Sequence, residues 1–271
     1  MIMSELFDLY ERECLPELTP RVRADYRRML RTLDDTFGYL EPQLLKPRHV
    51  VDFLAVKNGK VHRNRHVMLL SSIFKRARGS WCVDMDLDDP CNPCRRHPTK
   101  PRTRYVSDEE FNGFRANVPP SIQIAMDLAL LTGQRQGDIL ALRWDHIHDD
   151  GIYIDQGKSG GERKLAIAIS PAVEAVLGRA RALHPQLPRE YVVHTMYGRR
   201  YTGDGFRALW QIYMREWRKS HPDRWTFHDL RAKCVSDTGS LQDASLRAGH
   251  ADPRITSRVY DRNRRRVEPL R

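Results

Sequence analysis

Phe227-His228-Asp229-Leu230-Arg231 is followed, further along the same chain, by Ala248-Gly249-His250 and by Val259-Tyr260. A guanidinium and imidazoles suit a phosphate, because they donate charge-assisted hydrogen bonds to its oxygens. A tyrosine beside such groups can act as a nucleophile and form a covalent ester. The combination therefore predicts a site at which Tyr260 attacks a phosphodiester. Any one of these residues alone is more typical of packing, so the prediction depends on the whole set.

The composition favours a nucleic-acid partner. The 271 residues have a formal net charge of +11, and a basic balance of this kind is typical of proteins that bind a polyanion. No apolar run approaches the roughly 20 residues of a membrane span, and the N-terminus lacks the order of a signal peptide. The five scattered cysteines argue against a disulfide framework. We expect a soluble protein of a reducing compartment, with one large or two ordinary domains.

Residues 1–83 have the spacing of a helical domain. Thr19-Pro20 is a helix start, with an N-cap followed by proline at the first position. Further helices are predicted after Pro47 and over residues 61–78. The apolar stripes expected to form the core are Val22, Tyr26, Met29, Leu30 and Leu33 in one helix, and Val67, Leu70, Ile73, Phe74 and Ala77 in another.

Basic residues on these helices are candidates for contact with DNA phosphates. A solvated face is the alternative, and the sequence leaves both open. The candidates, together with two arginines from the segment that follows, are Arg27, Arg63, Arg65, Lys75, Arg76, Arg102 and Arg104.

Residues 84–104 are predicted to be a linker between two domains. Prolines alternate with basic residues in this segment, and proline at such density prevents a regular helix and stiffens the chain. Cys91 and Cys94, with Cys82 and His97, are a weak candidate for a zinc site, because a single CxxC lacks a second pair.

A second domain is expected over residues 105–271. Ser107 has the pattern of a capping box, and an apolar helix over residues 122–131 is followed by Arg135 at the start of a new helix. Backbone amides and the helix dipole favour an anion at that position. Arg135 is therefore a candidate phosphate ligand, although a surface arginine is the simpler interpretation in so basic a chain.

Alternating apolar residues around a glycine-rich turn predict a β-hairpin. Lys158 lies on the turn, from which a long side chain can reach a neighbouring groove, and Lys164 in the second strand is the competing candidate. A helix over residues 173–183, a short strand over residues 191–194 and a core-facing aromatic helix follow. That helix has its aromatic residues at Phe206, Trp210, Tyr213 and Trp217. The fold class is thus mainly α with a small β-hairpin, giving an α+β second domain.

The order of these residues resembles the tyrosine recombinases, the phage-integrase family. Residues 132–142, from Thr132 to Leu142, resemble the family's first arginine motif, and Lys158 lies where the family has its hairpin lysine. His228 to Arg231 resembles its HxxR motif, Gly249-His250 its GH box and Tyr260 its nucleophile. The N-terminal helices and the linker are similar to the family's core-binding domain, so the resemblance covers nearly the whole chain.

The resemblance implies a mechanism without a metal or a nucleotide cofactor. Tyr260 would form a 3′-phosphotyrosyl ester, Arg135 and Arg231 would stabilise the transition state, and Lys158 would protonate the departing 5′ oxygen. His228 would assist proton transfer at the tyrosine, and His250 would bond a phosphate oxygen. The implied function is site-specific DNA recombination, of an integrase or excisionase type.

The resemblance also implies partners and a location. Double-stranded DNA is the substrate, and a homo-tetramer on paired sites, monomeric when free, is expected, with accessory DNA-bending proteins as a possibility. The location implied is the cytoplasm of a bacterial or phage-infected cell, in association with the nucleoid. Two other functions stay open: a type IB-like topoisomerase, and a non-catalytic DNA-binding regulator on an integrase scaffold.

Three features depart from the family pattern. The interval from Arg231 to Gly249 is short, which predicts a trimmed helix pair. Only eleven residues follow Tyr260, so we expect the C-terminal helix that many members exchange between protomers to be reduced or absent. The chain begins directly at the core-binding helices, so no separate arm-type DNA-binding domain is expected.

Overall fold

The structure is a computed structural model, and it divides the chain into two compact units, Met1–Lys100 and Pro101–Arg271. It describes residues 1–56, 59–81, 83, 86–98, 102–155, 164–187, 190–249 and 262. Within these ranges, no helix combines the length and the apolar character that crossing a membrane requires.

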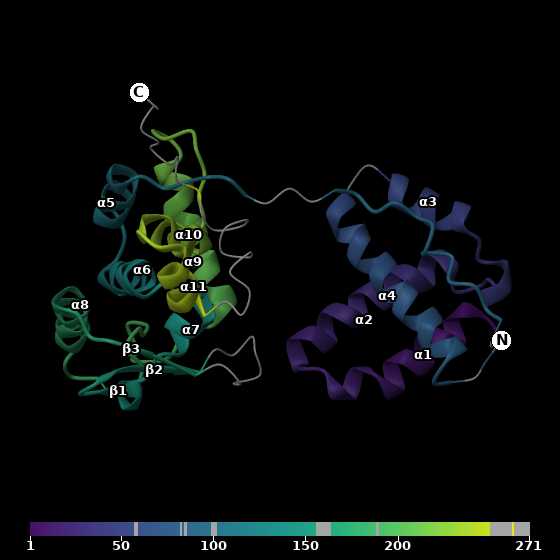
Figure 1. Ribbon diagram of the computed structural model, residues 1–271, viewed down its shortest axis with the longest axis horizontal. Helices are drawn as coiled ribbons and strands as arrows, with labels where there is room; N and C mark the ends of the chain where they lie inside the picture. Colours follow the sequence, from purple (N-terminus) through teal and green to yellow (C-terminus); the bar gives the residue numbers. More distant parts are fainter. Residues whose placement is uncertain are drawn as a thin grey trace, which may run out of the picture. The chain divides into compact units, whose positions relative to one another are not determined.

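The first unit is helical (Figure 1). Its elements are α1 (Met3–Glu13), the 3-10 turn η1 (Leu15–Glu17), α2 (Pro20–Phe37), η2 (Pro42–Leu44), α3 (Pro47–Ala55) and α4 (Lys60–Arg78). The helix starts predicted at Thr19-Pro20 and at Pro47 are confirmed, because proline occupies the first helical position in both α2 and α3.

The core of the first unit uses the predicted apolar stripes. All five residues predicted for the later stripe, on α4, are buried, and so are Met29, Leu30 and Leu33 on α2. Val22 was expected on the same stripe, but it lies in the first turn of α2 and is 38% exposed.

The boundary between the units lies later in the chain than the predicted end of the first domain at residue 83. The described residues of the predicted linker up to residue 98 pack on the first unit, because Leu87, Cys91 and Cys94 are buried in its core. The amide of Asn64 also pairs with the backbone of His97, with distances of 2.8 and 3.0 Å. The rest of the predicted linker, from Arg102, belongs to the second unit.

The second unit combines helices with one small sheet (Figure 1). Its helices are α5 (Asp108–Ala116), α6 (Pro120–Thr132), α7 (Gln136–Ala141), the 3-10 turn η3 (Trp144–His146), α8 (Pro171–Ala182), α9 (Gly203–Trp217), α10 (Phe227–Asp237) and α11 (Leu241–Ala248). Its strands are β1 (Ile147–His148), β2 (Gly151–Asp155) and β3 (Lys164–Ile167). The predicted capping box is confirmed, since Ser107 and Glu110 exchange hydrogen bonds of 3.0 and 3.1 Å.

The predicted hairpin is confirmed as the pair β2 and β3. The two strands are antiparallel, with Ile154 opposite Leu165 and Ile152 opposite Ile167, and β1 extends the sheet on the other side of β2. The turn that contains Lys158 lies outside the described residues, and Lys164 is the first residue of β3.

Helix α6 is central to the second unit, where it packs against α8 and α10. The aromatic stripe on α9 contributes Phe206 and Trp210 to the same core, as predicted. Residues 191–194 do not form the expected strand. They make only isolated bridges, Arg143 with Tyr191 and His194 with Arg200, because no continuous partner strand lies beside them among the described residues.

A left-handed glycine ends α6. Gly133 has φ of 68° and caps the helix, and a Cβ built on it would lie 3.1 Å from the sulfur of Cys234 on α10. Both the backbone conformation and the close approach of α10 therefore require glycine at this position.

We expect Gly133→Ala to lower the free energy of unfolding by about 1–2 kcal/mol, the cost of a left-handed conformation in a residue with a side chain. Gly178→Ala is the matched control, because Gly178 lies inside α8 with open space around it, and alanine there should be neutral or stabilising. Denaturant titration followed by tryptophan fluorescence measures both. A Gly133→Ala chain as stable as the control would contradict the requirement for glycine.

Candidate active site

Arg135 follows the glycine that ends α6 and is the N-cap of α7. The predicted position of this arginine at a helix start is confirmed. Arg135 is half-buried. The position of Arg135 is thus set by two adjacent helix ends, the C-terminus of α6 and the N-terminus of α7.

Arg231 joins two segments that are far apart in the sequence. Its side chain is buried on α10, with one Nη atom donating to the carbonyl of Gly133 at 2.7 Å and the other to the carbonyl of Ala248 at 2.5 Å. Gly133 lies two residues before Arg135, and Ala248 lies two residues before His250. One guanidinium therefore connects the two turns that lead to two other candidate catalytic residues.

Gln134 connects the same two turns. Its side-chain amide is buried and donates to the carbonyls of Thr132, at 3.0 Å, and of Arg247, at 2.9 Å. Arg247 returns a hydrogen bond of 3.4 Å to the carbonyl of Leu131. The end of α6 and the end of α11 are thus held together from both sides. Gln134 could not be recognised as a site residue from the sequence, because its role depends on a contact with a segment more than a hundred positions away.

His228 lies one helical turn from Arg231 on α10, at the spacing that puts two side chains on the same face. Burial of the ring is the largest effect that lowers the pKa of His228 from the ordinary value of 6.5, and the positive charge of Arg231 is the next. Arg262 and Arg135 act in the same direction. The residue as a whole remains exposed. The field at His228 therefore includes the charges of Arg135 and Arg231 together.

Three of the predicted catalytic residues lie outside the described residues: Lys158, His250 and Tyr260. The structure gives the positions of Arg135, His228 and Arg231, of the residues that precede His250, and of Arg262 after Tyr260.

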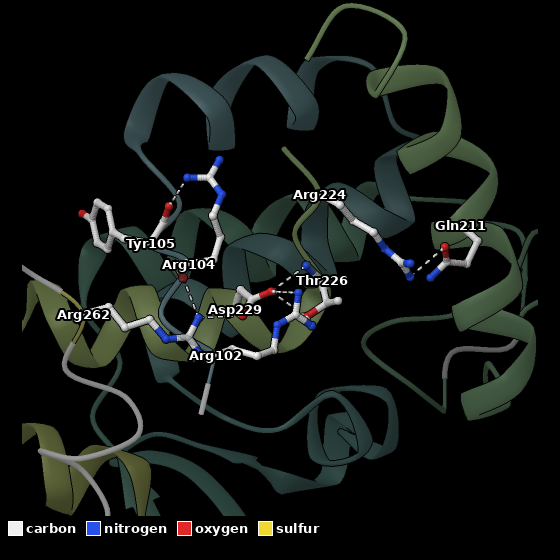
Figure 2. A network of polar contacts seen from close by, with 8 residues as sticks. All are labelled: Arg102, Arg104, Tyr105, Gln211, Arg224, Thr226, Asp229 and Arg262. Carbon is white, nitrogen blue, oxygen red and sulfur yellow. Dashed lines mark hydrogen bonds and ion pairs between the residues drawn. The ribbon is translucent and has the colours of Figure 1, made fainter. Parts of the chain in front are cut away.

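Asp229 and Arg262 form a buried ion pair beside the predicted site (Figure 2). The Asp229 carboxylate accepts hydrogen bonds from Nη1 of Arg262 at 2.6 Å and from the backbone and hydroxyl of Thr226 at 2.7 Å each. Burial acts to raise the pKa of Asp229, but the hydrogen bonds from Arg262 and Thr226 outweigh it, so the pKa is lowered. In the sequence Arg262 belongs to a basic tail and had no predicted role, because residue spacing does not show which arginine pairs with a buried carboxylate.

Several predicted DNA-binding residues of the first unit have intramolecular partners. Arg27 pairs with Glu11 at 2.6 Å, and Arg65 lies 3.9 Å from Asp25. The guanidinium of Arg63 lies 4.3 Å from the centre of the Phe53 ring, on α3.

Two others, Lys75 and Arg76, are exposed and half-buried, respectively. In the second unit, Arg102 lies 3.5 Å from Asp229, and Arg104 is paired with Glu110. Exposed ion pairs such as Arg27–Glu11 contribute little stability, so that pair leaves the Arg27 side chain available to a stronger anion, whereas Arg102 pairs with a buried carboxylate.

The candidate zinc residues have other hydrogen-bond partners. The Cys94 thiol contacts the carbonyl of Pro90 at 3.2 Å, and Nε2 of His97 lies 2.8 Å from the carbonyl of Leu54. Burial raises the pKa of the thiols of Cys91 and Cys94, which favours the protonated forms that do not bind zinc. In the part of the chain that the structure describes, which omits Cys82, no group of three or more potential ligands is placed to hold a metal ion.

Comparison with known proteins identifies the class. The family model for the phage integrase family matches residues 110–266, which is more than half of the chain. The chain therefore belongs to the phage integrase family, that of the tyrosine recombinases, and the resemblance noted in the sequence is confirmed.

Individual relatives agree with this class. The chain is 38% identical to the integrase of Escherichia phage HK022 over 77 residues, which cover 28% of this chain and 21% of that protein. It is 29% identical to a shufflon-specific DNA recombinase of Escherichia coli over 209 residues, 70% of this chain and 48% of that protein. The chain thus spans about half or less of the length of these curated relatives.

The fold matches that of lambda integrase. A dimer of that protein bound to a COC′ core site gives a TM-score of 0.82 at 18% identity, covering 100% of this chain and 80% of that one. A lambda integrase tetramer bound to a Holliday junction gives the same values. The predicted fold class, mainly α with a small β component, is confirmed by this match together with the three-stranded sheet.

We predict that His228 titrates below pH 6.5 in the chain without DNA. Because its pKa is lowered in the folded state, the folded chain binds fewer protons than the unfolded chain just below pH 6.5. Stability associated with this group is therefore complete above pH 6.5 and is lost as the pH falls from 6.5 to the folded pKa. NMR titration of the imidazole, assigned by comparison with His228→Gln, measures the midpoint, and a midpoint above 6.5 would contradict the prediction.

Proposed function

We propose that the chain is a site-specific DNA recombinase that cleaves and rejoins DNA strands through a 3′-phosphotyrosyl intermediate. Membership of the phage integrase family supports this function. The main structural support for this function is the pair of hydrogen bonds from Arg231, which link the turn before Arg135 to the turn before His250. Residues that are scattered in the sequence, among them the described Arg135 and Arg231, are thereby linked through one side chain.

The proposed chemistry balances without a cofactor. The phenol oxygen of Tyr260 attacks the phosphorus and loses its proton with the assistance of His228, while the bond from phosphorus to the 5′ oxygen breaks. Lys158 gives a proton to the departing oxygen. The phosphotyrosyl ester keeps the energy of the broken bond, so a 5′-hydroxyl can attack it and reseal the strand.

Charge stabilisation is assigned to the two arginines. Arg135 and Arg231 donate hydrogen bonds to the non-bridging oxygens as negative charge develops on them, and His250 bonds one of these oxygens. A preorganised donor of this kind contributes about 3 to 4 kcal/mol to catalysis. Arg231 is suited to the role, because its buried position on α10 is fixed by two carbonyls before substrate arrives.

Recombination requires several protomers, since four strands must be cut. We propose a homo-tetramer on paired DNA sites, and the structure of lambda integrase as a tetramer bound to a Holliday junction supports an assembly of this kind for the fold. A type IB-like topoisomerase would cut one strand without such an assembly. Supercoil relaxation by the chain, with no product from a substrate containing two sites, would favour that alternative.

The nucleophile can be tested with a nicked suicide substrate, which traps the covalent intermediate. We expect the wild-type chain to give a protein–DNA adduct on a denaturing gel and Tyr260→Phe to give none while retaining its affinity for DNA. Tyr197→Phe is the matched control, because Tyr197 is 72% exposed and is not assigned to the site. An adduct formed by Tyr260→Phe would remove the assignment, and a wild-type chain that binds DNA without forming an adduct would favour the non-catalytic regulator.

We predict that Lys75 on α4 contacts a DNA phosphate. Lys75→Ala should weaken binding to all DNA sequences alike and should reduce the slope of log affinity against log salt by about 1, because one counterion fewer is released. Lys219→Ala is the control, since Lys219 on the second unit pairs with Glu216 at 2.7 Å and is not a predicted contact. Equal salt slopes for Lys75→Ala and the wild type would exclude this contact.

A further inference from the structure

Asp229 is a carboxylate with almost no contact with solvent. Its side chain is 0% exposed, and its partners come from three parts of the second unit: Thr226 before α10, Arg102 near the start of the unit and Arg262 near the end of the chain. Figure 2 shows Arg102 and Arg262 reaching this carboxylate from different sides. A buried carboxylate must be paired and hydrogen-bonded to stay ionised, so its location determines where these arginines are held.

Arg262 is unusual among the arginines of so basic a chain, because its side chain is only 4% exposed. Nη1 donates to the Asp229 carboxylate at 2.6 Å and also to the backbone carbonyl of Arg104 at 2.6 Å. The backbone N–H of Arg262 donates to the hydroxyl of Ser236 at 2.8 Å. Both the side chain and the main chain of Arg262 are therefore attached to the second unit, with two of these bonds ending on α10.

This attachment lies close to the proposed nucleophile in the sequence. Two peptide units separate Tyr260 from Arg262, so their Cα atoms are at most about 7.6 Å apart. Asp229 is itself the residue after His228 and two positions before Arg231. The chain two positions after Tyr260 is thus bonded to the same helix that presents His228 and Arg231.

We propose that Arg262 and Asp229 are positioning residues, which fasten the chain just after Tyr260 to α10 of the same protomer and so limit where the phenol oxygen can lie. This inference rests on the proposed function, because it assumes that Tyr260 is the nucleophile. Neither residue touches the scissile phosphate. A nucleophile that is held near its line of attack reacts faster than one whose position varies. A displacement of about 1 Å can lower the rate by about 100-fold.

The alternative role for Arg262 is direct contact with DNA, as expected for an arginine of a basic tail. Its burial and its carboxylate partner argue against this role, since contact with a phosphate would require the pair to separate and leave Asp229 buried without its closest cation. Helix geometry also separates the two roles. Residues two apart on a helix do not face each other, so Asp229 lies on a different side of α10 from Arg231.

The first arm of the test measures the single-turnover rate of adduct formation at saturating DNA, on a suicide substrate with a 5′-phosphorothiolate at the scissile position. The sulfur leaves without needing a proton, so the rate reports attack by the nucleophile. We expect Arg262→Ala to slow this step by about 10- to 100-fold while DNA affinity is unchanged, and Arg262→Lys to restore part of the rate. Arg224→Ala is the matched control, because Arg224 is an exposed arginine of the same unit that bonds Gln211, and it should react like the wild type.

Asp229→Asn provides a second variant that keeps the shape of the side chain and removes its charge. If Asp229 and Arg262 act as a pair, the double variant should be no slower than the slower single variant, whereas independent roles would multiply the two losses. Adduct formation by Arg262→Ala at the wild-type rate, or multiplied losses in the double variant, would overturn the proposal.

The second arm does not depend on activity. Hydrogen–deuterium exchange of the full chain without DNA should show protection of the peptide containing the Arg262 amide, and Asp229→Asn should lose this protection more than Arg224→Ala does. An unprotected peptide in the wild type would overturn the anchor even if the wild type forms the adduct. If the wild type forms no adduct but the peptide is protected, the proposed function fails, and the positioning role fails with it, while the anchor itself stands.

Discussion

The buried guanidinium of Arg231 is the interaction on which the arrangement of the second unit depends. It lies on α10 and is bonded to a carbonyl at the end of α6 and to another at the end of α11, so three helices share one side chain. Helix ends leave carbonyls without partners, and a buried arginine with donors in a planar fork satisfies two of them at once. Gly133 makes this possible, because its left-handed conformation ends α6 and lets α10 approach closely.

Much of the fold was predictable because its signals are local. A proline after Thr19, the capping box at Ser107 and the alternation in β2 and β3 each depend on residues within a few positions of one another. The strand expected at residues 191–194 was wrong for the corresponding reason, since a strand exists only if a distant segment pairs with it. The first-domain boundary also depended on tertiary contacts, because Leu87, Cys91 and Cys94 join a core that begins with α1.

The candidate site likewise combines residues with local sequence signals and residues whose roles depend on distant contacts. Arg135, His228 and Arg231 were identified from residue type and order, and the structure describes all three in the second unit. The partners that hold them were not predictable. Gln134 acts through the carbonyl of Arg247, and Asp229 pairs with Arg262, at separations of 113 and 33 residues. Residue type in a basic tail does not show that Arg262 is paired with a buried acid, because the pairing depends on where the fold places Asp229.

Arginines near α10 have two kinds of partner, neutral carbonyls and a carboxylate. The carbonyls that bond Arg231 are neutral, so these two hydrogen bonds fix the guanidinium without neutralising its positive charge. The carboxylate of Asp229 instead balances charge from Arg262 and Arg102, which makes those arginines structural. Asp229 and Arg231, two positions apart on α10, thus take part in fixing arginine side chains in different ways, one through opposite charge and the other through neutral carbonyls. In a chain with a net charge of +11, a carboxylate that balances two arginines lowers the positive charge beside α10, whereas neutral carbonyls do not.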